Sequence, residues 1–134
     1  MNNMNLLELW RSVISDVASA DRPDLTLRQQ AILLNVYLRP QPHTVRGLAH
    51  SLNITKPAVT RALDTLSSLD LVKRKKDPND LRNVLVQRTV KGSVFLSEFS
   101  DMIRDAADEM NAQDPEDREK SASAQKFRWD GLFL

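Results

Sequence analysis

The 134-residue sequence has no cysteine, only three glycines and no long hydrophobic run. The lack of cysteine excludes a disulfide framework, thiol catalysis, thiol redox sensing and any zinc site with sulfur ligands. With only His43 and His50 and no glycine-rich phosphate loop, the chain offers no catalytic set and no histidine metal spacing. We therefore expect neither an enzyme nor a bound metal or cofactor. No segment reaches the roughly 18 apolar residues that cross a bilayer, and the start lacks a signal peptide, which predicts a cytoplasmic protein without a membrane partner.

A hydrophobic content of 41% in a chain of this length predicts one folded domain with one core. We place this domain at residues 1–111. Residues 112–134 read as an acidic, proline-containing linker followed by an apolar cluster that includes Phe127, Trp129 and Phe133.

The formal net charge of +1 conceals a strong separation of charge along the chain. Residues 39–91 contain eleven basic and four acidic side chains, a net charge of +7, whereas residues 1–38 carry −1 and residues 92–134 carry −5. Because the local field decides where a polyanion binds, the central segment remains a candidate for nucleic-acid binding. A solvated surface that is merely basic is the alternative interpretation.

Apolar spacing of three and four residues, together with capping residues, predicts five helices. Thr26 and Gln29 form a capping-box pattern, and Thr44, Thr55 and Thr89 precede three further helices. The expected helical ranges are 5–20, 27–38, 45–52, 55–69 and 90–111.

Between the last two helices the period changes to that of strands. Residues 71–89 consist of two stretches rich in Val, Lys and Arg around Asp77-Pro78-Asn79-Asp80, which suits a type I turn. The fold class predicted is therefore mainly α with a small antiparallel β-hairpin, and the hairpin must pack against the helices because an isolated hairpin is only marginally stable.

The helices at 45–52 and 55–69 have helix-turn-helix spacing. Ala49 provides the small residue where the two helices cross, Ile54 fills the turn, and Val59 seats the second helix. The outward face of the second helix predicts a surface that binds double-stranded DNA, with its N-terminal turn toward phosphate and Arg61 reaching base edges in the major groove. Pairing of Arg61 with Asp64 on the helix surface is the alternative. The candidate residues of this helix pair are Arg46, Thr55, Lys56, Pro57, Thr60 and Arg61.

The hairpin, with its wing at residues 72–89, supplies a second basic surface that can touch phosphates or enter the minor groove. Its candidate residues are Lys75, Lys76, Asp80 and Arg82. Asp80 lies two residues before Arg82, on the same side of an extended strand, where its carboxylate can orient the guanidinium. For Lys73 and Lys75 the alternative role is protection of an edge strand against aggregation.

From Leu25 to about Met110 the sequence resembles the multiple-antibiotic-resistance regulator (MarR) family of winged helix-turn-helix transcription factors. The resemblance rests on LTLRQQAILL, VRGLAHSLNITKPAVTRALDTLSSLDLVKRK and DPNDLRNVLVQRTVKG. It implies a DNA-binding core at 25–91, with Arg82 as a minor-groove reader and Asp80 as its orienting partner. Two departures from the family pattern are Asp70, where a glycine is usual, and Arg88, where a leucine is usual. Asp tolerates the left-handed turn moderately well.

The resemblance also implies a homodimer that pairs through its N-terminal helix, 5–20, and its C-terminal helix, 90–111. Packing within one chain is the alternative role for their apolar stripes. The tail at 112–134 either replaces a dimer contact or docks on a partner protein. The candidate dimerisation residues are Leu6, Trp10, Val13, Val17, Phe95, Phe99, Met102, Ile103 and Met110.

The function expected is a homodimeric, sequence-specific regulator of transcription that represses by occupying a palindromic operator. Two alternatives remain: a winged-helix module that binds protein through its apolar tail, and an architectural or replication-associated DNA-binding protein. The resemblance leaves a small-molecule effector open, and no residue pattern identifies one.

Overall fold

The computed structural model describes residues 2–113, which belong to two compact units. The winged unit comprises residues 23–98. The helical unit comprises residues 1–22 and 99–134, of which 2–22 and 99–113 are described. The predicted tail at 112–134 lies outside the described residues from position 114 onward, and the extent of the domain predicted at 1–111 stays a prediction.

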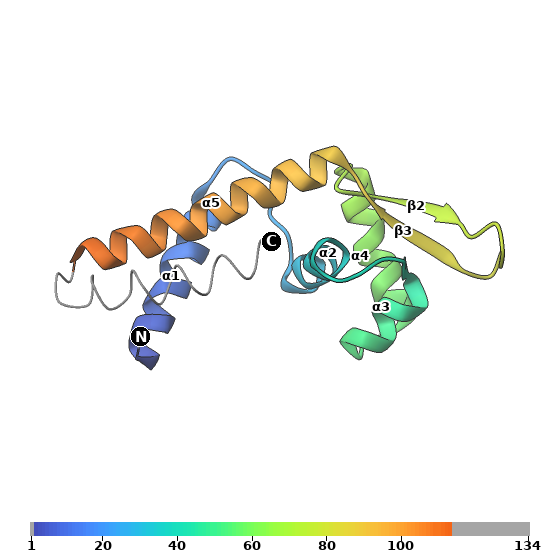
Figure 1. The fold of residues 1–134 in the computed structure, drawn as a ribbon, viewed down its shortest axis with the longest axis horizontal. Helices are drawn as coiled ribbons and strands as arrows, with labels where there is room; N and C mark the ends of the chain where they lie inside the picture. The colour runs from blue at the N-terminus through green and yellow to red at the C-terminus, as the bar shows by residue number, and fades with distance from the viewer. Residues whose placement is uncertain (1, 114–134) are drawn as a thin grey trace. The chain divides into compact units, whose positions relative to one another are not determined.

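Three helices form the scaffold of the winged unit (Figure 1): α2 (Leu27–Leu38), α3 (Val45–Leu52) and α4 (Lys56–Ser68). The capping box predicted at Thr26 is present, because its side chain accepts from the Gln29 backbone N–H while the Gln29 side chain accepts from the Thr26 backbone N–H. Thr44 and Thr55 cap α3 and α4 as expected. These caps satisfy backbone N–H groups that a helix leaves unpaired at its start.

The sheet has three strands rather than the two predicted. The hairpin strands β2 (Val72–Lys76) and β3 (Val84–Arg88) pair antiparallel, and β1 (His43–Thr44) pairs with the other edge of β3. The sequence of β1 is too short to show a strand period, and its pairing with Leu85 and Val86 is a contact between distant segments. The correct part of the prediction is a mainly α winged helix-turn-helix fold.

The core of the winged unit lies between α2, α3, α4 and the inner face of the sheet. Ile32, Val59 and Leu63 are completely buried, and the apolar positions of all three helices converge on them. The buried members of this core are Leu25, Ile32, Leu33, Val36, Leu48, Ala49, Val59, Ala62, Leu63, Leu66, Leu71, Val72 and Val86. No polar or charged side chain is buried among the described residues, so the unit depends on apolar packing.

A polar junction fixes the base of the wing to α2. The Tyr37 hydroxyl donates to the Leu71 carbonyl at 2.7 Å and accepts from the Thr89 backbone N–H at 2.8 Å. A Cβ at Gly92 would lie 1.9 Å from this hydroxyl, so the close approach requires glycine. Arg88 donates to the Val36 carbonyl at 2.8 Å and lies over the Tyr37 ring. Its charge therefore stabilises the C-terminal end of α2, which explains how a charged residue fits there.

Helix α5 (Val90–Gln113) begins in the winged unit, where Thr89 accepts from the Gly92 backbone N–H, and continues into the helical unit. Helix α1 (Asn3–Ser19) starts two residues earlier than predicted, because Asn2 caps it by accepting from the Asn5 backbone N–H. An asparagine-rich start carries no apolar period and hides this first turn. No helix within residues 2–113 is both long enough and apolar enough to span a membrane.

Candidate nucleic-acid interface

The turn between α3 and α4 has the tight geometry that a helix-turn-helix requires. Asn53 ends α3 in the left-handed conformation at φ 52°, and the Ile54 backbone N–H donates to the Ala49 carbonyl at 3.0 Å. Asparagine adopts this conformation more readily than most residues. Ala49 is buried and Ile54 packs against the core, as predicted. The turn therefore sets the angle at which α4 leaves α3.

Helix α4 has one face in the core and the other in solvent. The buried face consists of Val59, Ala62, Leu63 and Leu66. The exposed face carries the candidate DNA-binding residues, and each of them is open to solvent in the single chain: Thr55, Lys56, Pro57, Thr60 and Arg61. The arrangement leaves the positive end of the helix dipole beside two cationic side chains, a combination that attracts phosphate.

Arg61 does not pair with Asp64, so the alternative role considered for it is wrong. Its Nε lies 3.4 Å from the Pro57 carbonyl oxygen, one turn earlier on the same helix. Asp64 instead accepts from Arg74 on β2, with 2.8 Å between the two side chains. Arg61 therefore remains available to a ligand.

The Asp64–Arg74 ion pair is a feature that the sequence did not predict. It joins the middle of α4 to the middle of the wing strand β2, ten residues further along the chain. Only the folded hairpin brings these two residues together, so helical spacing gives no signal of it. The pair holds the two predicted DNA-contacting elements to each other, although an exposed pair contributes little to overall stability.

The tip of the wing differs from the turn predicted at Asp77–Asp80. The Asn83 backbone N–H donates to the Asp80 carbonyl at 2.9 Å, so the hydrogen-bonded turn lies at Asp80–Asn83. Asp77 closes the loop, since its backbone N–H donates to the Asn83 carbonyl and its carboxylate accepts from the Asn79 backbone N–H. The shift arises because the Asp77 side chain bonds locally instead of leaving the backbone to form a type I turn there.

The predicted contact between Asp80 and Arg82 is present, but both residues lie in the tip turn and not on an extended strand, because β3 begins only at Val84. The Asp80 carboxylate accepts from the Arg82 backbone N–H at 3.1 Å and from the Arg82 Nε at 3.2 Å. The bond from the Arg82 side chain is the main cause that lowers the pKa of Asp80, and Arg46 on α3 adds a smaller electrostatic contribution in the same direction. The Arg82 side chain is 86% exposed, so it projects from the tip while its Nε is held.

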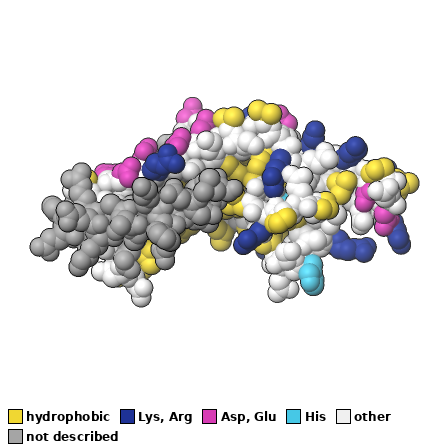
Figure 2. All heavy atoms as spheres, in the orientation of Figure 1, with side chains coloured by type: hydrophobic (Ala, Val, Ile, Leu, Met, Phe, Trp, Pro, Cys, Tyr) yellow, Lys and Arg dark blue, Asp and Glu magenta, His cyan; other side chains and the backbone are white. Residues whose placement is uncertain are grey.

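The wing strand β2 is an edge strand, with four exposed residues from Lys73 to Lys76. Lys75 and Lys76 therefore lie at the surface as expected, and the edge-protection role for Lys73 and Lys75 fits equally well. Basic side chains border the wing and the neighbouring α3–α4 region in the space-filling view (Figure 2). No cluster of potential metal ligands occurs in the part of the chain that the structure describes.

The candidate dimerisation residues differ in how much surface they leave open. Leu6 and Trp10 are exposed, at 43% and 47%. Val13 is 1% exposed within the single chain and so has almost no surface left for a partner. Phe95 packs against the core of the winged unit, and Arg22 lies over the Phe99 ring. The half-buried members are Val17, Phe95, Phe99, Met102, Ile103 and Met110.

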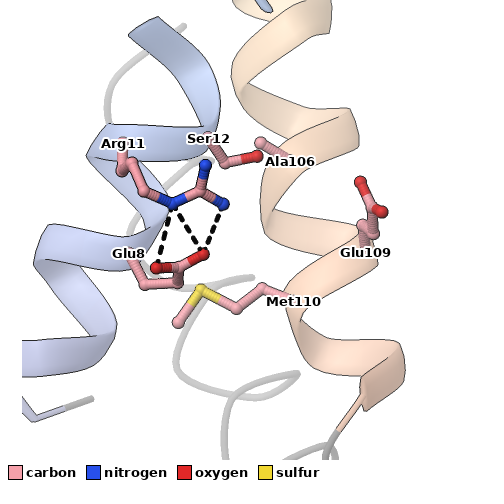
Figure 3. Close-up of a pocket in the computed structure, with 6 residues that line it drawn as sticks. All are labelled: Glu8, Arg11, Ser12, Ala106, Glu109 and Met110. Atoms are coloured by element: carbon pink, nitrogen blue, oxygen red, sulfur yellow. Dashed lines mark hydrogen bonds and ion pairs between the residues drawn. The ribbon is translucent and has the colours of Figure 1, made fainter. Parts of the chain in front are cut away.

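Within the helical unit, α1 and α5 border a small hollow of about 70 Å³ (Figure 3). Glu8 and Arg11, one turn apart on α1, form a two-point ion pair at its edge, and Met110 points toward them from α5. Sites for drug-sized ligands occupy roughly 300–1,000 Å³. This hollow is too small for an organic effector of that size.

Comparison with known sequences supports the winged helix-turn-helix geometry. Residues 25–84 match the sequence model of the MarR family. This segment, which holds the winged helix-turn-helix, is similar to the MarR family. It contains α2, α3, α4, β2 and the wing tip, so the MarR resemblance covers all ten candidate DNA-binding residues. No curated protein matches the chain.

Solved structures of other proteins share the fold over nearly the whole chain. A MepR variant from S. aureus bound to an oligodeoxyribonucleotide has a TM-score of 0.74 at 21% identity, covering 96% of this chain and 93% of that one. A mutant MarR from E. coli gives 0.67 at 24% identity, with 93% and 90% covered. A transcriptional regulator from Thermotoga maritima gives 0.68 at 20% identity, with 93% and 84% covered. At these identities the likeness establishes the fold.

The MarR match covers residues 25–84, and the likeness to the solved structures establishes the winged-helix fold. Within this fold the exposed face of α4 and the wing tip are surfaces open to a ligand.

Proposed function

We propose that the chain is a homodimeric, sequence-specific repressor that binds a palindromic operator. Helix α4 enters the major groove and the wing lies at the minor groove of each half-site. Two observations together support this proposal. The basic N-terminal turn of α4 is exposed, and on the wing Asp80 holds Arg82 in one orientation. The Asp64–Arg74 ion pair links these two elements.

The residues have distinct roles in this arrangement. Thr55, Lys56 and Arg46 bind phosphate, whereas Arg61 donates to a base edge, most favourably to guanine. Thr60 and Pro57 offer apolar and hydroxyl contact beside it. Lys75 and Lys76 bind phosphate along the wing, and Arg82 reads the width of the minor groove. The net charge of +7 over residues 39–91 favours this face over the acidic flanks.

The dimer is proposed from the apolar surface of α1. A single helix that leaves Leu6, Leu7, Trp10 and Ile14 between 43% and 61% exposed has an apolar stripe that the rest of the described chain does not cover. A second copy of the same stripe is a self-complementary partner, and a two-fold dimer presents two α4 helices one turn of DNA apart. Occupation of such a site within a promoter excludes polymerase, which is the basis for proposing repression.

Selection of bound sequences from a random duplex library, followed by titration of the selected duplex at several salt concentrations, tests the proposal. We expect an enriched palindrome with half-sites about 10 base pairs apart. With three to four phosphate contacts per subunit, log K should fall against log salt with a slope of roughly −5 to −7. Arg28→Ala, which removes an exposed arginine from α2, is the matched control for charge and should bind the selected duplex like the wild type.

Failure to enrich any sequence, or an affinity that does not depend on salt, contradicts the proposal. Enrichment without symmetry supports the architectural alternative. The protein-binding alternative is supported by two results together. The full chain does not bind DNA specifically, and truncation after Asn111 abolishes binding to a protein partner.

A further inference from the structure

A large apolar side chain stands at the tip of the wing, between the two residues of the arginine-orienting pair. Leu81 is 73% exposed and follows Asp80 directly. Exposure of a leucine side chain to water is unfavourable in free energy. Among the described residues, no other large and strongly exposed apolar side chain belongs to the wing. Single exposed leucines are common on protein surfaces. The position of this one, beside Arg82, gives it a specific environment.

The loop that carries Leu81 is held by its own hydrogen bonds. Asp77 and Asn83 close the loop through the backbone, and the Asn83 backbone N–H also donates to the Asp80 carbonyl. Arg82 donates to Asp80 through both its backbone N–H and its Nε. Both neighbours of Leu81 are therefore fixed before any ligand binds. A group presented in this way loses less conformational entropy on binding than one on an unstructured loop.

The charges around Leu81 identify the ligand that meets it. Arg82 projects next to it, Arg46 is close enough to act on the Asp80 carboxylate, and the exposed basic residues of β2 lead into the same loop. These basic side chains attract a polyanion rather than an apolar protein surface. A leucine makes no favourable contact with a phosphate group. The walls of the minor groove, however, are formed by deoxyribose carbons, and proteins that bind in this groove commonly use apolar side chains there.

We infer that Leu81 packs against the deoxyribose wall of the minor groove while Arg82 enters the groove beside it. This inference rests on the proposed function and adds to it a contact that carries no charge. The contact contributes affinity that does not change with salt, and it requires a groove narrow enough for Leu81 to reach the wall when Arg82 is inserted.

The test compares Leu81→Ala and Leu81→Met with the wild type on the selected duplex, across a series of salt concentrations. We expect Leu81→Ala to bind about five- to tenfold more weakly at every salt concentration, with an unchanged salt slope. Leu81→Met keeps the apolar contact and should bind within about twofold of the wild type. Leu27→Ala removes an equally exposed leucine from α2 and should have no effect, while Arg82→Ala should reduce the slope by about 1.

Three results overturn the inference. Equal affinity of Leu81→Ala and the wild type shows that Leu81 makes no contact, and a changed slope shows that the substitution acts through charge at the tip. A rise in emission of 2-aminopurine placed under the wing, dependent on Leu81, shows that the side chain separates bases instead of packing on sugar. Circular dichroism confirms that each variant folds. Failure of the wild type to bind any duplex overturns the proposed function as well, whereas normal wild-type binding confines the failure to Leu81.

Discussion

The winged unit and the helical unit treat their apolar residues in opposite ways. The winged unit buries thirteen apolar side chains in one cluster, with three helices against a sheet. In the described part of the helical unit only Val13, Ala106 and Ala107 are buried, while α1 leaves Met4 and Trp10 open to solvent. A core enclosed by three helices and a sheet is complete within one chain. The described part of the helical unit, α1 and residues 99–113 of α5, buries few of its apolar side chains.

The two units also differ in charge, and the difference follows their expected partners. Residues 23–98, the winged unit, carry a net charge of +6, whereas residues 1–22 and 99–134, the helical unit, together carry −5. A cationic surface suits DNA, and acidic segments elsewhere in the sequence disfavour binding through other parts of the chain. The larger buried core lies in the winged unit, and the proposed dimer contact lies in the helical unit.

The largest expected effect tests the completeness of the winged core. Leu63 on α4 is fully buried, so Leu63→Ala removes apolar contacts and leaves a cavity. We expect the free energy of unfolding to fall by about 2–5 kcal/mol, measured by urea denaturation monitored by circular dichroism. Leu27→Ala, at an exposed position on α2, is the control and should change it by less than about 0.5 kcal/mol. Equal effects of the two substitutions would show that the core is not where the stability lies.

The next effect tests the helical unit. Trp10 is exposed in the single chain, so Trp10→Ser should weaken dimer formation without destabilising the fold of one chain. For an aromatic residue central to an interface we expect a loss of about 2 kcal/mol, or a dimer Kd raised about 30-fold, measured by sedimentation equilibrium. Val13→Ser should instead lower the free energy of unfolding of the single chain, because Val13 is already buried. An unchanged dimer Kd for Trp10→Ser would remove α1 from the interface.

Much of the winged unit was predictable because its signals are local. Thr26, Thr44 and Thr55 each mark a helix start through a hydrogen bond that spans three residues. The range predicted for α3 is exact for the same reason. Asp70 adopts φ 59°, the left-handed conformation expected where the family usually has glycine. Signals of this kind are written within four residues of sequence.

The features that sequence reasoning missed depend on contacts between distant segments. Strand β1 exists because it pairs with β3, more than 40 residues away. The Asp64–Arg74 ion pair and the insertion of Arg88 at the end of α2 likewise need the folded sheet. In the site itself, Asp80 and Arg82 were predictable from their two-residue spacing, whereas the position of the tip turn was not.

A smaller effect separates specific from general binding within the winged unit. Arg61 is exposed and forms no ion pair with Asp64, so Arg61→Ala should cost about 1–3 kcal/mol on the selected duplex and relax the preference at one base pair. Lys75→Ala should weaken binding to all duplexes nearly equally, with the salt slope reduced by about 1. Competition binding with single-base variants of the duplex measures both. If Lys75→Ala leaves the slope unchanged, Lys75 serves only to protect the edge strand.

The smallest effect concerns Asp80, a negative charge placed where the ligand is itself negative. Asp80→Asn removes repulsion of phosphate but also weakens the bond that orients Arg82. We expect unchanged or slightly tighter binding to G·C-rich duplexes and a preference for narrow, A·T-rich minor groove reduced by about two- to threefold. The ratio of the affinities for the A·T-rich and G·C-rich duplexes, measured by fluorescence anisotropy, separates the orientation of Arg82 from the repulsion between Asp80 and phosphate.

The same ratio should respond to pH in a defined direction. The bond from Arg82 lowers the pKa of Asp80 below its ordinary value, so the pair is intact above that ordinary value and is lost only as pH falls through the lowered one. Between pH 5 and 8, about one unit or more above the ordinary aspartate pKa of about 3.9, the wild-type preference for A·T-rich duplexes should be constant. If the preference of the wild type for A·T-rich duplexes declines as pH falls from 8 to 5, and that of Asp80→Asn does not, then Asp80 gains a proton within this range. The orienting bond would then be weaker in solution than the geometry of the wing implies.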